Sequence, residues 1–338
     1  MLKYSVVNDV HPESWNSFLE TFSNGNFEQC FEYGEVVKKV YPRTKVIRLA
    51  CTQGREIVGL VQGTYSKYLG FGATLSVRRG PAINFKDKNH LIALKYLLNA
   101  LDDYARKERI VEISIQIPKA WQLINAFTSS GYFVAGELNE YVIRLKNSSD
   151  DLWKNISHNK RRNIKKAIRE GVEVFESRRK EDLQTFYLML KASEKRKGFK
   201  SYPYSWFETI WDIYKPNLSK VFLAVWKGKK LAGVFIVIHG KTVYAVAAGS
   251  LTEGWKVRCN DILHWKVMEW ACKQGYTLYH MGFVPQPPPC KHSREWGIWR
   301  WKREWKGELY RLIKLKKVTM SKYNPIRISK MILGKIIR

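Results

Sequence analysis

Two stretches of the chain have a predominantly apolar run on either side of a short polar turn. The first joins residues 46–50 (VIRLA) to 57–61 (IVGLV), and the second joins 221–226 (VFLAVW) to 231–237 (LAGVFIV). Runs rich in β-branched and aromatic residues around a glycine-containing turn predict antiparallel β-hairpins. In both stretches a turn glycine is followed five residues later by a strand glycine: Gly54 and Gly59, then Gly228 and Gly233. The chain therefore contains one hairpin pattern twice, at an offset of 174 residues from Gly54 to Gly228.

The elements around the two hairpins repeat in the same order. A helix predicted over 97–109 leads into a strand at 110–115, and a helix over 262–274 leads into a strand at 276–279. A helical segment precedes each hairpin, near Trp15 and again near Trp153. A repeat of this length predicts a tandem duplication of one α+β domain.

The length of 338 residues is sufficient for two domains. The polar stretch 146–151 separates the repeats and can supply a helix N-cap, so we expect the join there. The predicted domains are 1–147 and 148–320, followed by a basic tail at 321–338. From residue 309 onward there are nine Lys and Arg and no acidic residue, among interspersed aliphatic residues. The tail is typical of a membrane-surface anchor, and the alternative is a terminal helix packed on the second domain.

The composition indicates a folded protein with an anionic partner. Hydrophobic residues make up 45% of the chain, which excludes the composition of a disordered protein. The 59 Lys and Arg exceed the 30 Asp and Glu and give a formal net charge of +29, which attracts phosphate-bearing partners. Charge alone does not distinguish RNA, anionic lipid and nucleotide substrates.

The cysteines and the hydropathy predict a cytoplasmic protein without a metal. Five cysteines with no CxxC pair do not read as a disulfide framework, and no signal-like or 18-residue apolar segment is present. We expect neither export nor a membrane span. A zinc site would have to come from residues that lack knuckle spacing, so we expect none: Cys259, His264, Cys272, His280, Cys290 and His292. His264 reads as a packing residue on an amphipathic helix.

The last third of the chain carries the most distinctive segments. Residues 260–265 (NDILHW) open a helix, and 297–309 (GIWRWKREWKGEL) follow about thirty residues later. Cations interleaved with tryptophans at this density need an anion or water for their charges while the rings pack beneath. Read as a strand, this segment would place Trp299 and Trp301 on one face and Lys302 on the other.

These segments, with several others in order, resemble the FemABX aminoacyltransferases. The further markers are 27–39 (FEQCFEYGEVVKK), 79–81 (RGP), 160–167 (KRRNIKKA) and 194–199 (EKRKGF). The resemblance covers nearly the whole chain and implies an α+β fold of two tandem GCN5-related acetyltransferase (GNAT) domains, each a mixed twisted sheet flanked by helices. The chain departs from the family at 279–283 (YHMGF), where an aspartate and paired glycines are usual, and at 305–307 (WKG), in place of Phe-Gly-Gly.

The resemblance implies transfer of an amino acid from aminoacyl-tRNA to an amine of a peptidoglycan precursor, which is carried on a nucleotide or lipid diphosphate, with no cofactor. By motif position, Lys38 and Arg196 resemble diphosphate-contacting cations, and Tyr244 resembles a substrate-contacting aromatic residue. Lys302 and the preceding Trp301 are the predicted catalytic residues, and Lys302 resembles the lysine that stabilises the tetrahedral oxyanion in catalysis.

The same motifs hold the other predicted contacts. Lys39 and Arg79 are predicted to bind substrate. The predicted tRNA-phosphate contacts are Lys160, Arg161, Arg162, Lys165 and Lys166, for which a solvated helix face is the alternative.

Two other functions fit the same sequence. One is an acyl-CoA-dependent N-acyltransferase of the GNAT type that acts on a polysaccharide or small-molecule amine. The other is a non-catalytic RNA-binding protein that keeps the basic surface. In the favoured interpretation the protein is a monomer whose partners are aminoacyl-tRNA and a diphosphate-linked precursor, and it meets the membrane at the inner face of the cytoplasmic membrane.

Overall fold

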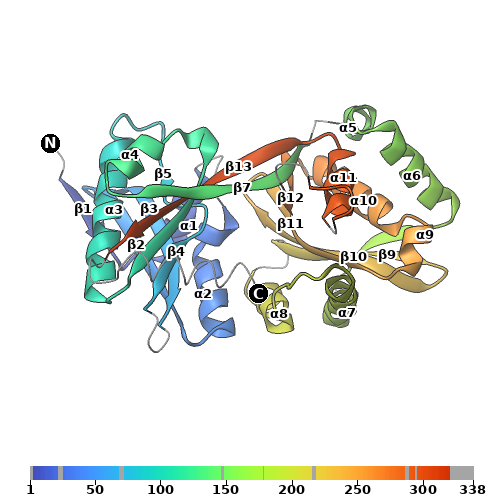
Figure 1. The fold of residues 1–338 in the computed structure, drawn as a ribbon, viewed down its shortest axis with the longest axis horizontal. Helices are drawn as coiled ribbons and strands as arrows, with labels where there is room; N and C mark the ends of the chain where they lie inside the picture. The colour runs from blue at the N-terminus through green and yellow to red at the C-terminus, as the bar shows by residue number, and fades with distance from the viewer. Residues whose placement is uncertain are drawn as a thin grey trace. The chain divides into compact units, whose positions relative to one another are not determined.

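The computed structural model describes residues 3–21, 26–67, 72–145, 148–177, 179–214, 218–285, 289–293 and 295–319. The chain forms two compact units, each described here by itself (Figure 1). One contains the residues up to Glu137 together with those from Leu312 onward, and the other contains Leu138–Arg311. Within the described ranges, none of the helices combines the length and apolarity needed to cross a lipid bilayer.

The first unit combines a mixed sheet with helices. Its strands are β1 (Tyr4–Val7), β2 (Thr44–Gln53), β3 (Glu56–Ser66), β4 (Thr74–Val77), β5 (Ala82–Ile83) and β6 (Glu112–Pro118), with most of β13 (Glu308–Val318). Its helices are α1 (Pro12–Glu20), α2 (Phe31–Val40), α3 (His90–Lys107) and α4 (Ile124–Thr128), with the short 3₁₀ helices η1 (Phe27–Gln29) and η2 (Lys119–Trp121).

The second unit repeats this plan. Its strands are β8 (Glu173–Ser177), β9 (Ser219–Trp226), β10 (Lys229–His239), β11 (Thr242–Ser250) and β12 (Leu278–Phe283), with the later part of β7 (Phe133–Arg144). Its helices are α5 (Ser149–Asn155), α6 (His158–Arg169), α7 (Lys180–Lys197), α8 (Tyr204–Ile213), α9 (Glu253–Lys256), α10 (Cys259–Lys273) and α11 (Trp296–Arg303).

Both units have the same sheet topology, as the repeat in the sequence predicts. The strand order is β1-β2-β3-β4-β6-β13 in the first unit and, from the corresponding edge, β8-β9-β10-β11-β12-β7 in the second. The predicted hairpins are confirmed as β2–β3 and β9–β10, with Gly54 and Gly228 in their turns at φ 64° and 75°. Each hairpin leads to a strand that pairs in parallel with the strand after the next long helix: β4 with β6 across α3, and β11 with β12 across α10.

The units exchange their last strands. β7 follows α4 of the first unit, but its residues 140–144 pair with β12, and β13 follows α11 of the second unit, but its residues 312–318 pair with β6. The predicted domain ranges 1–147 and 148–320 differ from the units at both joins for this reason, because strand pairing decides to which unit residues 138–145 and 312–319 belong. The predicted tail at 321–338 lies outside the described residues.

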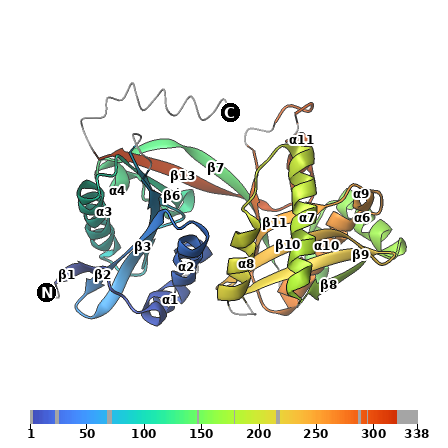
Figure 2. The same ribbon diagram turned by 90° about the horizontal axis from the view of Figure 1, so that it is seen from below.

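Helices cover both faces of each sheet (Figure 1; Figure 2). In the second unit α7 and α8 cover one face, and α5, α6 and α10 lie over the other. β10 shows the alternation that makes this possible, since Val234 and Ile236 join the core beneath α10 while Phe235 packs its ring against Phe186 of α7 and Phe207 of α8. In the first unit α3 covers one face, and α1 and α2 lie at the other.

The segment with the alternating tryptophans is a helix, so reading it as a strand is wrong. Trp299 and Trp301 pack against the core of the second unit from α11, and Trp305, which follows the helix, is fully buried. Trp296 and Trp299 stack one turn apart, with ring centroids 4.9 Å from each other. A three-residue separation places the two side chains on one helix face, where their rings can stack.

A buried lysine joins α6, α10 and α11. The Nζ of Lys160 lies 2.5 Å from Asp261 Oδ1 and 3.3 Å from Glu304 Oε2, and the Lys160 side chain is 0% exposed. The rings of Trp301 and Trp305 lie 4.6 and 4.7 Å from the same Nζ. Two carboxylates and two aromatic faces thus replace the water that this ammonium would otherwise bind.

We expect Lys160→Met to lower the free energy of unfolding by about 3–5 kcal/mol, because Asp261 would be left buried without its counter-ion. Urea unfolding at pH 7 measures this. Lys165→Met, an exposed position on the same helix, is the control and should change stability by less than about 0.5 kcal/mol. Equal effects of the two substitutions would contradict the role given to Lys160.

Candidate functional site

The two parallel strands of the second unit pair over a short length only. The described partners are Thr242 with Leu278, Val243 with Tyr279, and Tyr244 with His280. Beyond His280, β12 forms a bulge, and its pairing register with β7 shifts between His280 and Phe283. Gly282, inside the bulge, has a φ of 72°, a conformation that favours glycine. The bulge directs backbone carbonyl groups out of the regular ladder.

The side chain of Lys302 ends on these carbonyl groups. From α11 its Nζ donates hydrogen bonds to the carbonyl oxygens of Met281 (2.7 Å), Gly282 (3.3 Å) and Phe283. An ammonium group has three N–H donors, so three acceptors match its full capacity. Burial lowers the pKa of Lys302 to about 7, with the carboxylate of Glu140 acting to raise it and the charge of Lys197 acting to lower it. Near neutral pH such a group can serve either as a cation or as a proton acceptor.

A histidine and a glutamate lie beside this bulge. His280 Nε2 is 3.1 Å from Glu140 Oε2, and the N–H of Gly282 donates to His280 Nδ1 at 3.2 Å. The His280 ring lies between two tyrosines, with centroid distances of 5.2 Å to Tyr244 and 5.7 Å to Tyr310. Both His280 and Glu140 are buried. The end of β12 therefore gathers an amine, a carboxylate, an imidazole and two phenols.

The structure brings some of the predicted site residues together and separates others. Tyr244 of β11 lies against the ring of His280, and Lys302 donates to the bulge that follows His280 in β12. Trp301 instead donates its indole N–H to Asp261 Oδ1 at 2.8 Å, next to Lys160. Arg196 donates to the carbonyl oxygen of Ser250 and to Ser193 Oγ, so it fastens α7 to the end of β11.

A basic hollow follows the outer side of α6. It has a volume of ≈ 580 Å³, and its lining contains no carboxylate: His158, Arg161, Arg162, Asn163, Lys165, Lys166, Arg169 and Arg258. Arg258 reaches it from the start of α10 with a left-handed backbone, φ 61°. Four of the five predicted tRNA contacts line this hollow. Lys160 does not, and its predicted contact with tRNA is corrected because its side chain is fully buried against Asp261 and Glu304.

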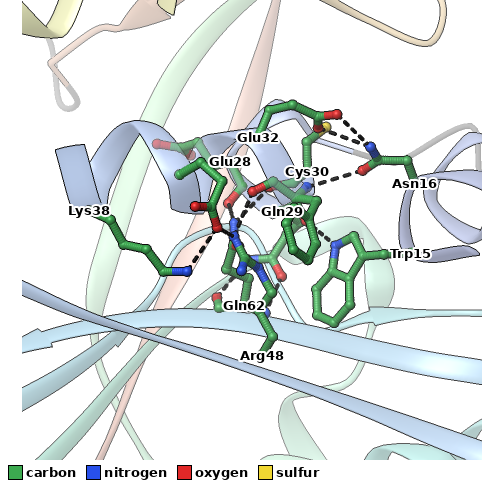
Figure 3. Close-up of polar contacts among 11 residues, drawn as sticks. Trp15, Asn16, Glu28, Gln29, Cys30, Glu32, Lys38, Arg48 and Gln62 are labelled. Atoms are coloured by element: carbon green, nitrogen blue, oxygen red, sulfur yellow. Dashed lines mark hydrogen bonds and ion pairs between the residues drawn. The ribbon is translucent and has the colours of Figure 1, made fainter. Parts of the chain in front are cut away.

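The first unit has a buried polar network where the motif 27–39 meets the sheet (Figure 3). Gln29 accepts from the N–H of Gln62 at 2.8 Å and donates to the carbonyl oxygen of Arg78 at 2.7 Å. The Gln62 amide donates to the carbonyl oxygens of Glu28 and Cys30, and its Oε1 accepts from Arg48 at 2.8 Å. The network fixes η1 and the start of α2 on β2 and β3, since each of these buried amides has donors and acceptors matched.

The predicted substrate-binding cations of the first unit lie around this network. Lys38 is exposed and donates to Glu35 Oε1 at 2.9 Å, an oxygen that Arg48 also contacts at 2.8 Å. Lys39 is exposed beside it on α2. Arg79 pairs with Glu28 at 2.7 Å from a left-handed backbone, φ 47°. Since Lys38 and Arg196 belong to different units, their predicted convergence on one diphosphate stays a prediction.

His264 occupies the packing position expected of it. It is 5% exposed and its Nδ1 lies 2.7 Å from the hydroxyl of Tyr279. Burial lowers its pKa to about 3, so the ring is neutral. Among the residues that the structure describes, no three His, Cys, Asp or Glu side chains are grouped to hold a metal ion.

Sequence reasoning missed two residues of these sites. Glu140 gives no signal, because one acid in an otherwise ordinary strand is common, and its role depends on a pairing with β12 across 140 residues of sequence. Arg258 lies between α9 and α10, outside the basic run of α6. The positive net charge predicted a basic surface, but it did not indicate that Arg258 would line it.

Comparisons with known proteins agree with this arrangement. A model of the acetyltransferase (GNAT) domain family matches residues 155–303. The lipid II:glycine glycyltransferase of Staphylococcus aureus is 22% identical over an alignment of 390 positions, which covers 90% of this chain and 90% of that protein. The crystal structure of FemX superposes with a TM-score of 0.80 at 17% identity, covering 91% of this chain and 96% of FemX.

The predicted fold is confirmed by these matches and by a further solved structure. A tandem GNAT protein from the clavulanic acid biosynthesis pathway has a TM-score of 0.58 at 10% identity and covers 95% of this chain and 100% of its own. The fold of this chain, with a mixed sheet between helices in each unit, is thus shared with FemX and with this tandem GNAT protein. The chain is thus similar over almost its whole length to the lipid II:glycine glycyltransferase, and it shares the fold of FemX.

Proposed function

We propose that this protein is an aminoacyltransferase that moves an amino acid from aminoacyl-tRNA to an amine of a peptidoglycan precursor of the lipid II type. The observation that carries the proposal is the buried amine of Lys302, held at the end of β12 in a fold shared with FemX. The relative that aligns with 90% of the chain is a glycyltransferase named for lipid II.

The proposed reaction is the aminolysis of an ester. The acceptor amine attacks the ester carbonyl, a carbon–nitrogen bond forms, and negative charge develops on the carbonyl oxygen. The carbon–oxygen bond to the ribose then breaks, and the proton lost by the amine balances the one gained by the ribose oxygen. Binding both substrates in one orientation lowers the barrier, and a fixed cation at the developing oxyanion lowers it further.

Lys302 is the group that we assign to this oxyanion. Of its three hydrogen bonds, the one to the Gly282 carbonyl is the longest, at 3.3 Å. The N–H that makes it can therefore turn to an oxyanion with the smallest loss of hydrogen-bond energy. The protein environment has already removed the surrounding water, which strengthens any charge interaction made there. Trp301 has a positioning role, because its indole holds Asp261 and so ties α11 to α10.

The hollow along α6 is the surface that we assign to the tRNA. Its lining presents Arg162, Lys165, Lys166, Arg169 and Arg258 with no carboxylate among them. RNA phosphates are bound by such cations in a manner that depends on salt, because each contact releases a counterion. Lys38, Lys39, Arg79 and Tyr244 remain the proposed contacts of the diphosphate-linked acceptor. Association with the membrane surface, where a lipid-linked acceptor would be met, is proposed from the basic tail.

The experiment that tests the function is a transfer assay with charged total tRNA and lipid II in detergent. We expect labelled amino acid to reach the precursor, and ribonuclease added beforehand to abolish the transfer. Transfer that survives ribonuclease and requires an acyl-CoA thioester would replace this proposal with an acyl-CoA-dependent N-acyltransferase. Binding of RNA with no transfer to any amine would leave an RNA-binding protein.

We expect Lys302→Ala to lower the single-turnover rate by about 10²–10³-fold with little change in KM, since the lost interaction would be made only in the transition state. Rapid-quench measurements with saturating charged tRNA provide the rate. Lys273→Ala, at an exposed position in the last turn of α10, is the control and should leave the rate unchanged. A fall of less than about tenfold for Lys302→Ala would assign the residue a structural role.

We expect Lys165→Ala and Arg258→Ala each to weaken tRNA binding and to reduce the slope of log Kd against log salt concentration by about 0.7–0.9, the value for one phosphate contact. Filter binding at several salt concentrations measures the slope. Lys273→Ala again serves as the control and should leave it unaltered. Slopes that stay the same in all three variants would remove the hollow from the RNA interface, and loss of binding to anionic vesicles instead would identify it as a membrane contact.

A further inference from the structure

The contacts of His280 fix which of its ring nitrogens carries the proton. The N–H of Gly282 can only donate, so His280 Nδ1 is the acceptor at 3.2 Å. The remaining proton of a neutral ring then lies on Nε2, which faces Glu140 Oε2 at 3.1 Å. The imidazole therefore connects the carboxylate of β7 to the backbone of the bulge in β12.

These contacts bridge the irregular part of β12 at both ends. His280 pairs with Val142 and Phe283 pairs with Glu140, while the register shifts between them. The backbone of Glu140 thus pairs with Phe283 at the end of the bulge, and its side chain contacts His280 at the start of the bulge. Regular strand hydrogen bonds do not hold the intervening residues, so the His280 side chain supplies one of the bonds that keep Gly282 at its φ of 72°.

The bulge in turn provides the acceptors for Lys302. The carbonyl oxygens of Met281, Gly282 and Phe283 take its three hydrogen bonds, and a small rotation of these peptides would remove them. A buried ammonium group without acceptors is costly, so Lys302 would move toward solvent. The position of the amine depends on a backbone shape that a histidine and a glutamate maintain.

We propose that Glu140 and His280 are a positioning pair that shapes the Met281–Phe283 bulge and thereby holds the Lys302 amine at the reacting ester. The contact part of the proposal stands on the structure, and its catalytic consequence rests on the proposed function. Neither residue has to touch the substrate. Their effect on the reaction passes through Lys302.

Four variants separate positioning from charge. His280→Phe keeps a ring between the two tyrosines but removes both nitrogens, and Glu140→Met keeps the length of the side chain without its oxygens. His280→Asn and Glu140→Gln are the conservative partners, because each keeps an acceptor in place of the one that is lost. Glu137→Met, an exposed position in the same strand, is the control.

The first measurement is the titration of the Lys302 amine by NMR in protein with ¹³C-labelled lysine, which needs no substrate. We expect its midpoint, near pH 7 in the native protein, to rise by about one pH unit or more in His280→Phe and Glu140→Met as the amine moves toward water. Glu140→Gln should lower the midpoint instead, because it keeps the geometry and removes a charge that favours the ammonium. His280→Asn and Glu137→Met should change it little.

The second measurement is the single-turnover rate. We expect a loss of about tenfold or more in kcat with unchanged KM for His280→Phe and Glu140→Met, and near-native rates for the two conservative variants. An unchanged Lys302 midpoint in both disruptive variants, or equal loss in Gln and Met at position 140, would overturn the proposal. If the disruptive variants do not fold, a midpoint that fails to fall in Glu140→Gln would overturn it. Native protein that transfers nothing but titrates as expected would refute the proposed function and leave the positioning pair in place.

Discussion

The ammonium group of Lys160, buried between Asp261 and Glu304, is the interaction on which the rest of the second unit depends. It is enclosed by groups from α6, from α10 and from the end of α11, with the rings of Trp301 and Trp305 completing the enclosure. A charge without water tolerates few arrangements, because each missing contact costs several kcal/mol. A hydrophobic contact in the same place would let α11 slide. The ion pair instead defines the position of the helix, and Lys302 lies one residue beyond Trp301 on it.

The candidate site itself is built from departures from regular structure. β11 and β12 share three pairs only, β12 bulges beyond them, and the bulge turns three carbonyl groups toward one amine. Such irregularities are retained where the surrounding structure fixes them, and here Glu140 and His280 contribute to this. The two buried networks differ in kind. In the first unit, Gln29, Gln62 and Arg48 have matched partners and hold secondary structure together. In the second unit, burial lowers the pKa of Lys302 to about 7, so its amine changes charge near neutral pH.

The sequence predicted those features that repeat or that follow from local chemistry. Both hairpins, the long helices after them and the N-cap at Ser148 could be found because glycine turns and period-specific apolar patterns are local signals. Reading the tryptophan-rich segment as a strand failed because alternating Trp and basic residues are compatible with a helix and with a strand; the structure forms α11 there, with Trp305 buried after it. Lys160 looked like its neighbours in a basic run, and only the three-dimensional fold shows that one lysine of that run faces inward. Glu140 and Arg258 acquire their roles from contacts between distant segments, which a single sequence does not encode in any local pattern.

The exchange of last strands has a consequence for how the chain is made. During synthesis the first unit emerges with β6 lacking the neighbour that β13 provides, and that neighbour is among the last described residues to be translated. An uncovered strand edge is a template for wrong partners, so the nascent first half is exposed to aggregation until the second half is complete. Pairings of such high sequence separation also form slowly. A polypeptide released before β13 is made would therefore leave the sheet of the first unit without its last strand, although every strand of the second sheet would be present.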